Sequence, residues 1–329
     1  MAKFIGRRVN IGMGKETTRG VATAPTYWFP KMSLSMDDKI MFATDDSSVG
    51  VIEDSQTQDI TSRYSEGSIE GRVTDRGIGL LLLATLGAEN ATTTPEIGVR
   101  DHNFVVGQSA QHNSLTIAVA EPNSNSGNGF SYALGMIDNL DINFEVGQYA
   151  TYKADIRANA GSSVASTVAF VAENAFRPQD ITFRTASAIG GLNAASPIVI
   201  KKGSISIKKN LEDDIVLGNV NPVDRLNKQF SVEGTIEIIY DSRVQIDTNM
   251  LGDLAVAMRI QMINTSVVIG TTLNPTLTID LARVKLGEVA RKIDNDGIVS
   301  ETLKFKSFYS LTDTRMITAV LRNTVLALY

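Results

Sequence analysis

The chain has 329 residues with a net charge of −5, no Cys and two His. The missing cysteines exclude disulfides, thiolate-bound zinc, iron–sulfur clusters and cysteine nucleophiles, and two His cannot form a His-rich metal site. The mild acidity argues against a protein that reads nucleic-acid sequence through a basic face, and no apolar run approaches the roughly 20 residues that span a membrane.

A basic, glycine-punctuated segment opens the chain at Lys3–Arg19. Its Gly12–Thr17 stretch fails as a phosphate-binding loop, because Val9 stands where the motif needs its first glycine and Glu16 follows the lysine in place of Ser or Thr. We interpret the segment as an arm that contacts another molecule, with a frayed terminus as the alternative. The basic side chains of this arm are Arg7, Arg8, Lys15 and Arg19.

Two strands and a helix follow. Lys31–Met36 predicts the first strand, and a second begins at Glu66–Glu70 and runs to about Thr74. Ile78–Leu86 is apolar almost throughout and stops at Gly87, which is typical of a short buried helix with a glycine C-cap.

The rest of the chain predicts mostly strands, at Leu115–Val119, Leu140–Val146, Tyr152–Ile156, Ile198–Ile200, Ile205–Ile207, Leu277–Ile279 and Leu303–Phe305. Asn249–Ile260 differs, because apolar side chains at helical spacing predict a second helix there. The polar stretch Asn159–Ser163 at the midpoint predicts a linker. The fold class is therefore mainly β, a β-sandwich or half-barrel with a short flanking α-helix, in two domains at residues 1–160 and 161–329.

The two domains read as copies of one unit. Glu66–Glu70 is EGSIE, and Glu233–Glu237, about half the chain length further on, is EGTIE. Lys31–Met36 has a counterpart in Lys202–Ile207, at nearly the same separation. Two matches in the same order, at about half the chain length, predict a tandem duplication.

No motif indicates catalysis or a cofactor. His102 and His112 lie in a polar region without a converging carboxylate pattern, so we expect solvated loop histidines. Three acidic clusters lack the spacing of a calcium loop and predict solvated turns, at Asp37–Asp38, Asp45–Asp46 and Glu212–Asp214. The sequence has no Gly-x-Ser-x-Gly nucleophile elbow. We therefore expect no enzymatic activity, no cofactor and no metal site.

The order of these elements resembles that of the major tail tube proteins of long-tailed bacteriophages. The resemblance is carried by the Gly- and Arg-containing N-terminus, the Glu66–Glu70 strand that feeds the helix before Gly87, the strand at Leu134–Ile142, and Ile205–Leu217, which leads to Glu233–Glu237. It implies a β subunit whose sheets join those of its neighbours into a large closed β-barrel. Stacked rings would then form a hollow tube that conducts DNA to the host.

The resemblance also implies partners and a location. The partners are further copies of the chain, a tape-measure protein, and tail terminator and baseplate or tail-tip proteins, with transient, non-specific passage of DNA and no membrane insertion. The location is the virion tail, assembled in the host cytoplasm. The resemblance implies six-membered rings for tube proteins with a single unit, so a chain with two copies of the unit favours a ring of three subunits with pseudo-six-fold symmetry. A hexamer in which one half builds the tube and the other decorates it is the alternative.

Carboxylates in the channel would repel the phosphates of passing DNA. We therefore hypothesise that one face of two strands lines the lumen, through Glu66, Ser68, Glu70, Arg72, Glu233, Thr235 and Glu237. The alternative is that this face meets the outer solvent. The N-terminal arm and a C-terminal arm at Thr318–Tyr329 would make contacts between rings.

Two other functions remain open on the sequence. One is a different virion or secretion-tube β-protein, such as a capsid decoration protein or the tube of an injection apparatus. The other is a carbohydrate-binding or hydrolytic β-domain, which predicts clustered surface aromatics or a convergent acid pair.

Overall fold

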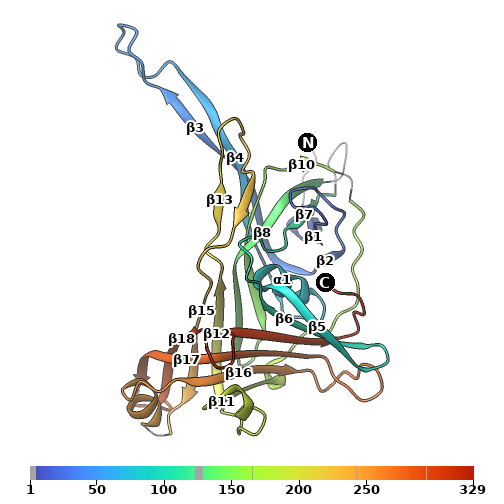
Figure 1. Ribbon diagram of the computed structural model, residues 1–329, viewed down its shortest axis with the longest axis vertical. Coiled ribbons are helices and arrows are strands. Elements are labelled where there is room, and N and C mark those ends of the chain that lie inside the picture. Colours follow the sequence, from blue (N-terminus) through green and yellow to red (C-terminus); the bar gives the residue numbers. More distant parts are fainter. Residues whose placement is uncertain (1–4, 123–128, 165, 242, 294) are drawn as a thin grey trace.

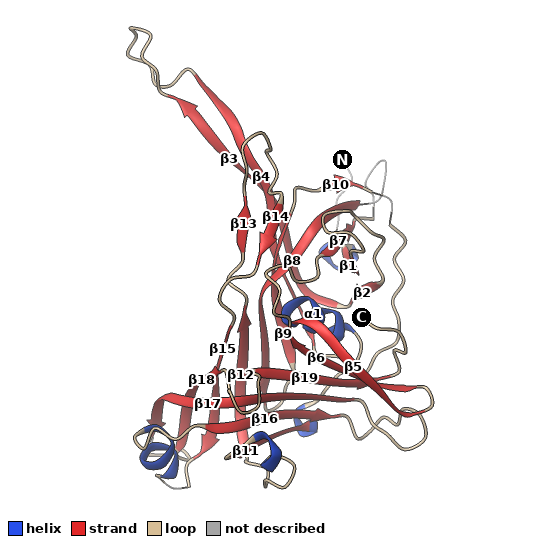
Figure 2. Cartoon of the chain, in the orientation of Figure 1, coloured by secondary structure: helices blue, strands red, loops and turns tan. Residues whose placement is uncertain are grey.

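The computed structural model describes residues 5–122, 129–164, 166–241, 243–293 and 295–329, and Figures 1 and 2 show that most of this chain is β-strand. Lys3, part of the expected arm, lies outside the described residues. The pairings between the named strands are all antiparallel. The predicted mainly β fold with a short helix is therefore confirmed.

The described residues of the first half form one α-helix and ten strands, which are β1 (Asn10–Lys15), β2 (Tyr27–Phe29), β3 (Lys31–Asp45), β4 (Thr57–Arg72), α1 (Gly77–Leu86), β5 (Gly87–Glu96), β6 (Val99–Val106), β7 (Leu115–Ala120), β8 (Gly129–Glu145), β9 (Thr151–Ala158) and β10 (Ser162–Ser163). The second half holds β11 (Ile181–Ala186), β12 (Ile200–Lys208), β13 (Glu212–Asp214), β14 (Asp224–Leu226), β15 (Ser231–Ile239), a π-helical turn at Gln245–Met250, β16 (Val256–Ile263), β17 (Thr276–Lys292), β18 (Ser300–Phe308) and β19 (Ile317–Asn323). Short 3₁₀ turns lie at Gly6–Arg8, Pro178–Asp180 and Ile189–Gly191.

Eight strands form one continuous sheet, which we call the main sheet. Its order is β3-β4-β9-β8-β12-β15-β18-β17. Strands β8 and β17 enter it only with their C-terminal halves. Their N-terminal halves belong to a second layer, where β8 pairs with β7 and β10, and β17 pairs with β16 and β19. Strands from the two halves of the chain also pair with each other, at β8–β12 and β6–β19.

The core lies between the main sheet and the second layer. Alternating side chains of the main sheet point into it, and Ile69, Ile142, Ile205 and Ile236 are almost fully buried there. Each such side chain stabilises the fold by about 1.5–3 kcal/mol. The other face of the main sheet carries polar side chains, as expected for an antiparallel sheet with one wet face.

Helix α1 fills the first half of this core. All ten of its residues are buried, which explains why its sequence lacks a polar stripe. It ends at Gly87, whose backbone has φ 94° and whose N–H donates to the carbonyl of Leu83. This left-handed cap favours glycine, and the predicted helix and its end are confirmed.

The two halves repeat the same strand pairing. In each, a hairpin leads to a helical turn and a long strand that passes from the second layer into the main sheet. Ser35 pairs with Ser68 between β3 and β4, and Ser204 pairs with Thr235 between β12 and β15. These pairs make Ser35 the equivalent of Ser204, whereas the letters alone align Ser33 with it. A shift of two keeps every side chain on its face.

Irregularities in pairing recur at the same places in both halves. The ladder shifts between Lys31 and Ser33 in β3, and between Ile200 and Lys202 in β12. It shifts between Ile137 and Asn139 in β8, and between Leu286 and Glu288 in β17. It also shifts where β7 and β16 meet these long strands, between Leu115 and Ile117 and between Val256 and Met258. Because a bulge fixes a specific local geometry, three matched irregularities mark equivalent strands.

Two expected elements are wrong. The second helix at Asn249–Ile260 is replaced by the turn at Gln245–Met250 and by strand β16. Asp253, with φ 54°, lies between them, and the apolar side chains of Ala257–Met262 serve the alternating inner face of a strand. The midpoint linker is wrong in part, because Ser162 and Ser163 pair with β8 as strand β10.

Candidate functional site

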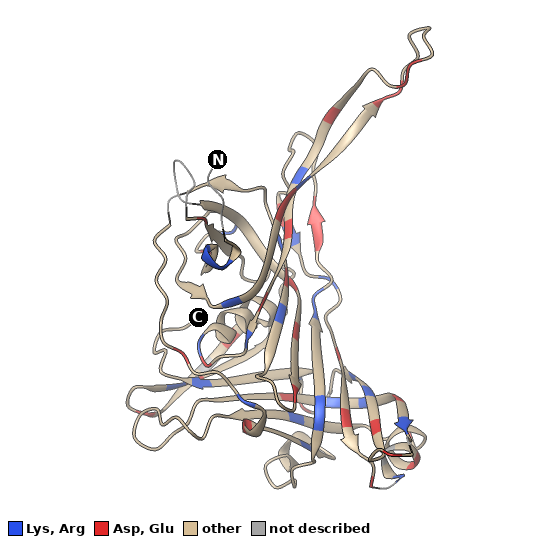
Figure 3. Cartoon of the chain, turned by 180° about the vertical axis from the view of Figure 1, so that it is seen from behind, with Lys and Arg blue, Asp and Glu red and all other residues tan. Residues whose placement is uncertain are grey.

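The polar face of the main sheet is the first candidate site. On β4, the side chains of Glu66, Ser68 and Glu70 lie opposite Arg157, Asp155 and Lys153 of β9. On β15, Glu233, Thr235 and Glu237 lie opposite Lys306, Lys304 and Thr302 of β18. Directly opposite residues share a face, so the register places all of these side chains on one surface. Figure 3, which shows the chain from behind, displays acidic and basic positions interleaved along these strands.

Ion pairs with lysines neutralise several of the glutamate charges on this face. Lys208 binds Glu233, Lys202 binds Glu237 at 3.2 Å, and Lys304 binds Glu288 at 2.7 Å. The hydrogen bond and charge of Lys208 lower the pKa of Glu233, which stays ionised at neutral pH. The expected acidic character is therefore too simple, because the carboxylates run beside cations. Arg72 is exposed at the end of β4, with its guanidinium 5.2 Å from the ring centre of Tyr149.

The main sheet ends in two unpaired edges within the described residues. Strand β3 pairs only with β4, and residues 285–292 of β17 pair only with β18. An open edge presents backbone N–H and C=O groups that another strand can bind. The main sheet therefore exposes one edge at each side that can pair with a further strand.

Two hairpins project from the main sheet at one end (Figure 1). One is the tip between β3 and β4, where Val49, Val51 and Ile52 are exposed. The other is the β13–β14 insertion between β12 and β15, where Ile215–Leu217 is exposed. The backbone N–H of Arg63 donates to the carbonyl of Val220 at 2.7 Å and links the two hairpins.

The opposite end of the main sheet also exposes apolar side chains. The β8–β9 and β17–β18 turns lie there, because antiparallel strands return at alternate ends. Exposed apolar side chains in these turns include Val146, Tyr149, Ile293 and Ile298. Both ends of the subunit thus expose apolar side chains.

A model of the phage tail tube protein family matches residues 6–307. The chain belongs to the phage tail tube protein family. Its role is structural, and the family places it in the virion tail. None of the curated proteins compared with the chain matches it.

Two properties of this tail tube protein bear on other functions. Among the described residues, no group of three or more His, Asp and Glu side chains is placed to hold a metal ion. No helix in the described part of the chain is long and apolar enough to cross a membrane.

The basic residues of the expected N-terminal arm lie in three environments. Arg7 and Arg8 are exposed in the 3₁₀ turn at Gly6–Arg8. Lys15 ends β1, and its Nζ donates to the carbonyl oxygen of Tyr329 at 3.2 Å. Strand β1 itself lies between β2 and β7, so the arm is wrong from Asn10 onward.

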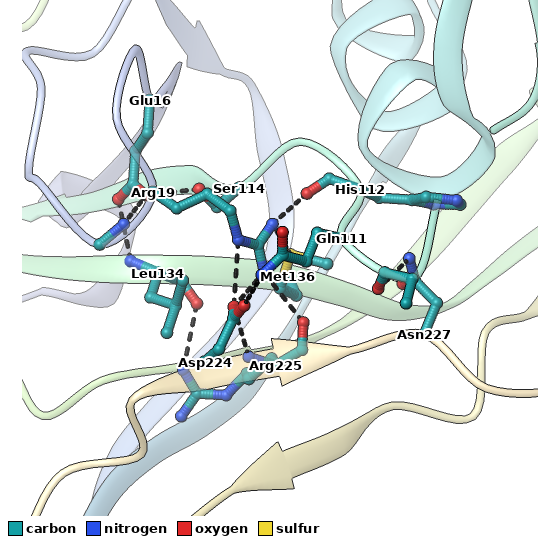
Figure 4. Close-up of polar contacts among 12 residues, drawn as sticks. Glu16, Arg19, Gln111, His112, Ser114, Leu134, Met136, Asp224, Arg225 and Asn227 are labelled. Carbon is teal, nitrogen blue, oxygen red and sulfur yellow. Dashed lines mark hydrogen bonds and ion pairs between the residues drawn. The ribbon is translucent and has the colours of Figure 1, made fainter. Parts of the chain in front are cut away.

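Arg19 is not available for another ring, because it holds the two halves together (Figure 4). Its Nε donates to Asp224 at 3.0 Å, and one of its terminal nitrogens donates to the carbonyl of Arg225 at 2.9 Å. Arg225 is fully buried and donates to the carbonyls of Leu134 and Ala158 at 3.1 and 2.8 Å. These contacts fasten strand β14 to the first half.

Sequence reasoning missed a second buried cation near this junction. Lys209 follows β12, is fully buried, and donates to the carbonyl of Ala84 at the C-terminal end of α1, 2.8 Å away. Burial lowers its pKa to about 7. A helix C-terminus favours a cation, which offsets part of the cost of burial. A single lysine between polar residues carries no sequence signal for this role.

Both histidines are buried, so the expected solvated loops are wrong. His102 lies in β6 and bonds Glu89 at 2.6 Å and the carbonyl of Val325 at 2.9 Å. His112 bonds the carbonyl of Gly107 at 2.9 Å. Burial, helped by the charge of Lys209, lowers the pKa of His112 to about 4. Polar neighbours in sequence suggested exposure, but Glu89 and Val325 bond both ring nitrogens of His102, and Gly107 bonds Nε2 of the buried His112.

The C-terminal arm is also wrong. Strand β19 pairs with β17 and β6, and the ring of Tyr329 packs on α1 so closely that it leaves no room for a Cβ on Gly79. The hydroxyl of Tyr329 donates to the carbonyl of Arg76 at 2.9 Å. Its backbone N–H donates to Glu89, also at 2.9 Å. These contacts integrate the segment into the subunit core.

Proposed function

We propose that three copies of this chain close their main sheets into a ring, and that stacked rings form a conduit for DNA. The observation that carries this proposal is the main sheet itself, which has one wet face and an unpaired edge at each side. Ring closure would pair every edge, which removes the hazard of open strands.

The number three combines the repeat with the six-membered rings that the resemblance implies for tube proteins with a single unit. Each half contributes four strands, β3-β4-β9-β8 and β12-β15-β18-β17, so each chain supplies two equivalent units. The matched irregularities support a tandem duplication, with domains near residues 1–160 and 161–329. Six units in three chains give pseudo-six-fold symmetry.

Such a ring would have 24 strands and an aqueous channel. At about 4.8 Å between strands, its backbone diameter is roughly 37 Å before strand tilt widens it. Side chains take about 5 Å from each wall, which leaves a bore of roughly 27 Å.

The polar face lines the bore in this proposal, because the second layer covers the apolar face. The lumen then includes Glu66, Ser68, Glu70, Arg72, Glu233, Thr235 and Glu237. Interleaved carboxylates and lysines limit phosphate binding, since Lys202, Lys208 and Lys304 already have carboxylate partners. DNA would pass without settling on the wall.

The projecting hairpins are the surfaces we assign to stacking. Their exposed apolar tips at one end would meet the apolar turns at the other end of the next ring. Arg7 and Arg8 remain candidates for contacts between rings. We expect assembly in the host cytoplasm with a tape-measure protein, and capping by terminator and baseplate or tail-tip proteins.

Negative-stain microscopy and native mass spectrometry of the purified protein test this function. Hollow rods of uniform diameter, with rings of three 35.5-kDa chains, are expected. A protein that stays monomeric at all concentrations and salt conditions would overturn the proposal. A ring of six chains would replace the trimer by the hexamer alternative.

A separate experiment tests the lumen. Phage carrying Lys at Glu66, Glu70, Glu233 and Glu237 should build normal tails but deliver DNA less well, because an excess of cations retains phosphates. Normal delivery by these tails would show that the face does not line the channel.

A further inference from the structure

The chain already contains one complete junction between two units. At this internal seam, β8 of the first half pairs with β12 of the second. Asn139 lies opposite Lys208, and Asp141 lies opposite Ser206. The internal seam is therefore a template for a junction between two copies of the same unit.

The open edges are the equivalents of the two seam strands. Strand β3 matches β12, and the hydroxyl pairs Ser35–Ser68 and Ser204–Thr235 make Ser35 the equivalent of Ser204. Strand β17 matches β8, and their common bulge makes Glu288 the equivalent of Asn139. Each open edge of the main sheet is thus a strand, β3 or β17, whose equivalent in the other half, β12 or β8, forms the internal seam.

We infer that β3 of one subunit pairs antiparallel with residues 285–292 of β17 in the next, in the register of the internal seam. This inference rests on the proposed ring. Carrying over the equivalent positions places Lys39 opposite Glu288 and Asp37 opposite Ala290.

The charges on the polar face suit this register. Within one chain, Glu66 lies 3.9 Å from Lys39, and Glu288 lies 2.7 Å from Lys304. Placing Lys39 beside Glu288 joins the two pairs into a row of alternating charges across the seam. A shift of two residues in one direction would instead put Lys39 beside Ala290 and lose this match.

On the side that faces the subunit core, the proposed seam differs from the internal seam, because charged residues replace buried isoleucines. The buried Ile207 and Ile142 of the internal seam correspond to Asp38 and Arg291 at the outer edges. Diagonal neighbours of this kind interact across an antiparallel pair. Inward-pointing charge on an edge strand also prevents unspecific pairing before the ring closes.

Disulfide cross-linking can measure the register, because the chain has no cysteine of its own. Directly opposite residues have Cα atoms about 4.5–5.5 Å apart, within disulfide range, whereas diagonal pairs are too far apart. Asp37→Cys with Ala290→Cys is the test variant, since both positions are exposed. Asp37→Cys with Glu288→Cys is the control that is two residues out of register.

The internal seam supplies a second control. Ser206→Cys with Asp141→Cys should form a disulfide within one chain and leave the mass on a non-reducing gel at that of a monomer. The test variant, oxidised in assembled rods, should give a ladder that ends at three chains. A mixture of chains carrying only Asp37→Cys and chains carrying only Ala290→Cys should give dimers alone.

The outcomes separate the seam from the proposed function. Rods in which the out-of-register pair cross-links and the test pair does not would overturn the register and leave the tube intact. Rods with no cross-link at either pair would exclude β3 and β17 as the junction. Wild-type protein that forms neither rings nor rods would overturn the proposed function, and the seam with it.

Discussion

Strands β3 and β12 are equivalent by register, yet their surroundings differ. β12 has a neighbour on each side, and its inward side chains Ile205 and Ile207 are fully buried. β3 has one neighbour, and the corresponding Met36 and Asp38 are half-buried and exposed. The local pattern of a strand therefore sets which face is inward, but the neighbouring strand sets how deeply that face is buried.

The difference continues past the end of β12. The next residue there is Lys209, which is buried against α1. The equivalent residue in β3 is Ile40, which is 48% exposed. The exposure of the apolar Ile40, at a position where the other half buries a lysine, is explained if β3 contacts another molecule and β12 does not.

The largest effect that distinguishes the strands is expected at two equivalent glycines. A Cβ at Gly234 would overlap the carbonyl oxygen of Ser204 in β12, and a Cβ at Gly67 would overlap that of Ser35 in β3. Backbone must move in both cases. Because β12 is held on both sides, Gly234→Ala should cost about 3–4 kcal/mol of unfolding free energy and Gly67→Ala about half as much.

Urea denaturation of the two variants under monomeric conditions measures this difference. Equal losses would mean that β3 is as firmly held as β12 without a neighbouring subunit. The same substitutions in assembled rods should differ less, since assembly would hold β3 on both sides.

A smaller effect on the free energy of unfolding is expected from His112, which is close to Lys209, the buried residue that follows β12. Its folded pKa is about 4, against about 6.5 when unfolded, so the folded state binds fewer protons between these values. The free energy of unfolding should therefore rise by about 2–3 kcal/mol as pH increases from 4 to 6.5. Lys209 and Arg19 are the cations that contribute to this shift.

Thermal or urea unfolding across this pH range tests the histidine. His112→Gln should lose that portion of the rise, whatever its effect on packing at pH 7. A variant with the full slope would assign the pH dependence to other groups.

These sites show what the sequence could and could not predict. The strand at Glu66–Glu70, its twin at Glu233–Glu237 and the helix before Gly87 were predictable, because alternation and a glycine cap are local signals. The face shared by the glutamates followed from the same alternation. The alignment of β3 with β12 was not predictable, because a bulge leaves no mark in the letters.

Non-local pairing accounts for the remaining errors. The segment at Asn249–Ile260 has apolar spacing that suits a helix, but β11 and β17 flank its second part and make it a strand. Burial of His102, Arg19 and Tyr329 depends on partners in the other half of the chain. No short window of sequence contains both members of these contacts.

On the polar face, charge reversal of Lys39 at the seam should prevent assembly, whereas reversal of Lys208 away from the outer edges should not, and both should change subunit stability little. Lys208 and Glu233 are both nearly half exposed, so Lys208→Glu should cost less than about 1 kcal/mol. Lys39→Glu should leave the subunit equally stable, yet prevent rods because it places a second carboxylate beside Glu288 at the seam.

Light scattering and microscopy test this pair of variants. Adding Glu288→Lys to Lys39→Glu should restore rods, because the two charges are exchanged across the seam. Lys208→Glu should form rods without a second change. If Lys39→Glu abolishes rods and the added Glu288→Lys does not restore them, Lys39 and Glu288 do not lie opposite each other at the seam.

The smallest effect on the subunit is expected at its N-terminus. Arg7 and Arg8 are exposed, so replacing both with Ala should change the unfolding free energy by less than about 0.5 kcal/mol. Deleting residues 1–15 is a poorer test of the arm, because it also removes Ile11 and Met13, which are fully buried in β1. If the two arginines contact the next ring, the double variant should form single rings but few rods. Rods of normal length would mean that Arg7 and Arg8 are not needed for stacking, and would leave the hairpin tips and the turns at the opposite end as the stacking surfaces.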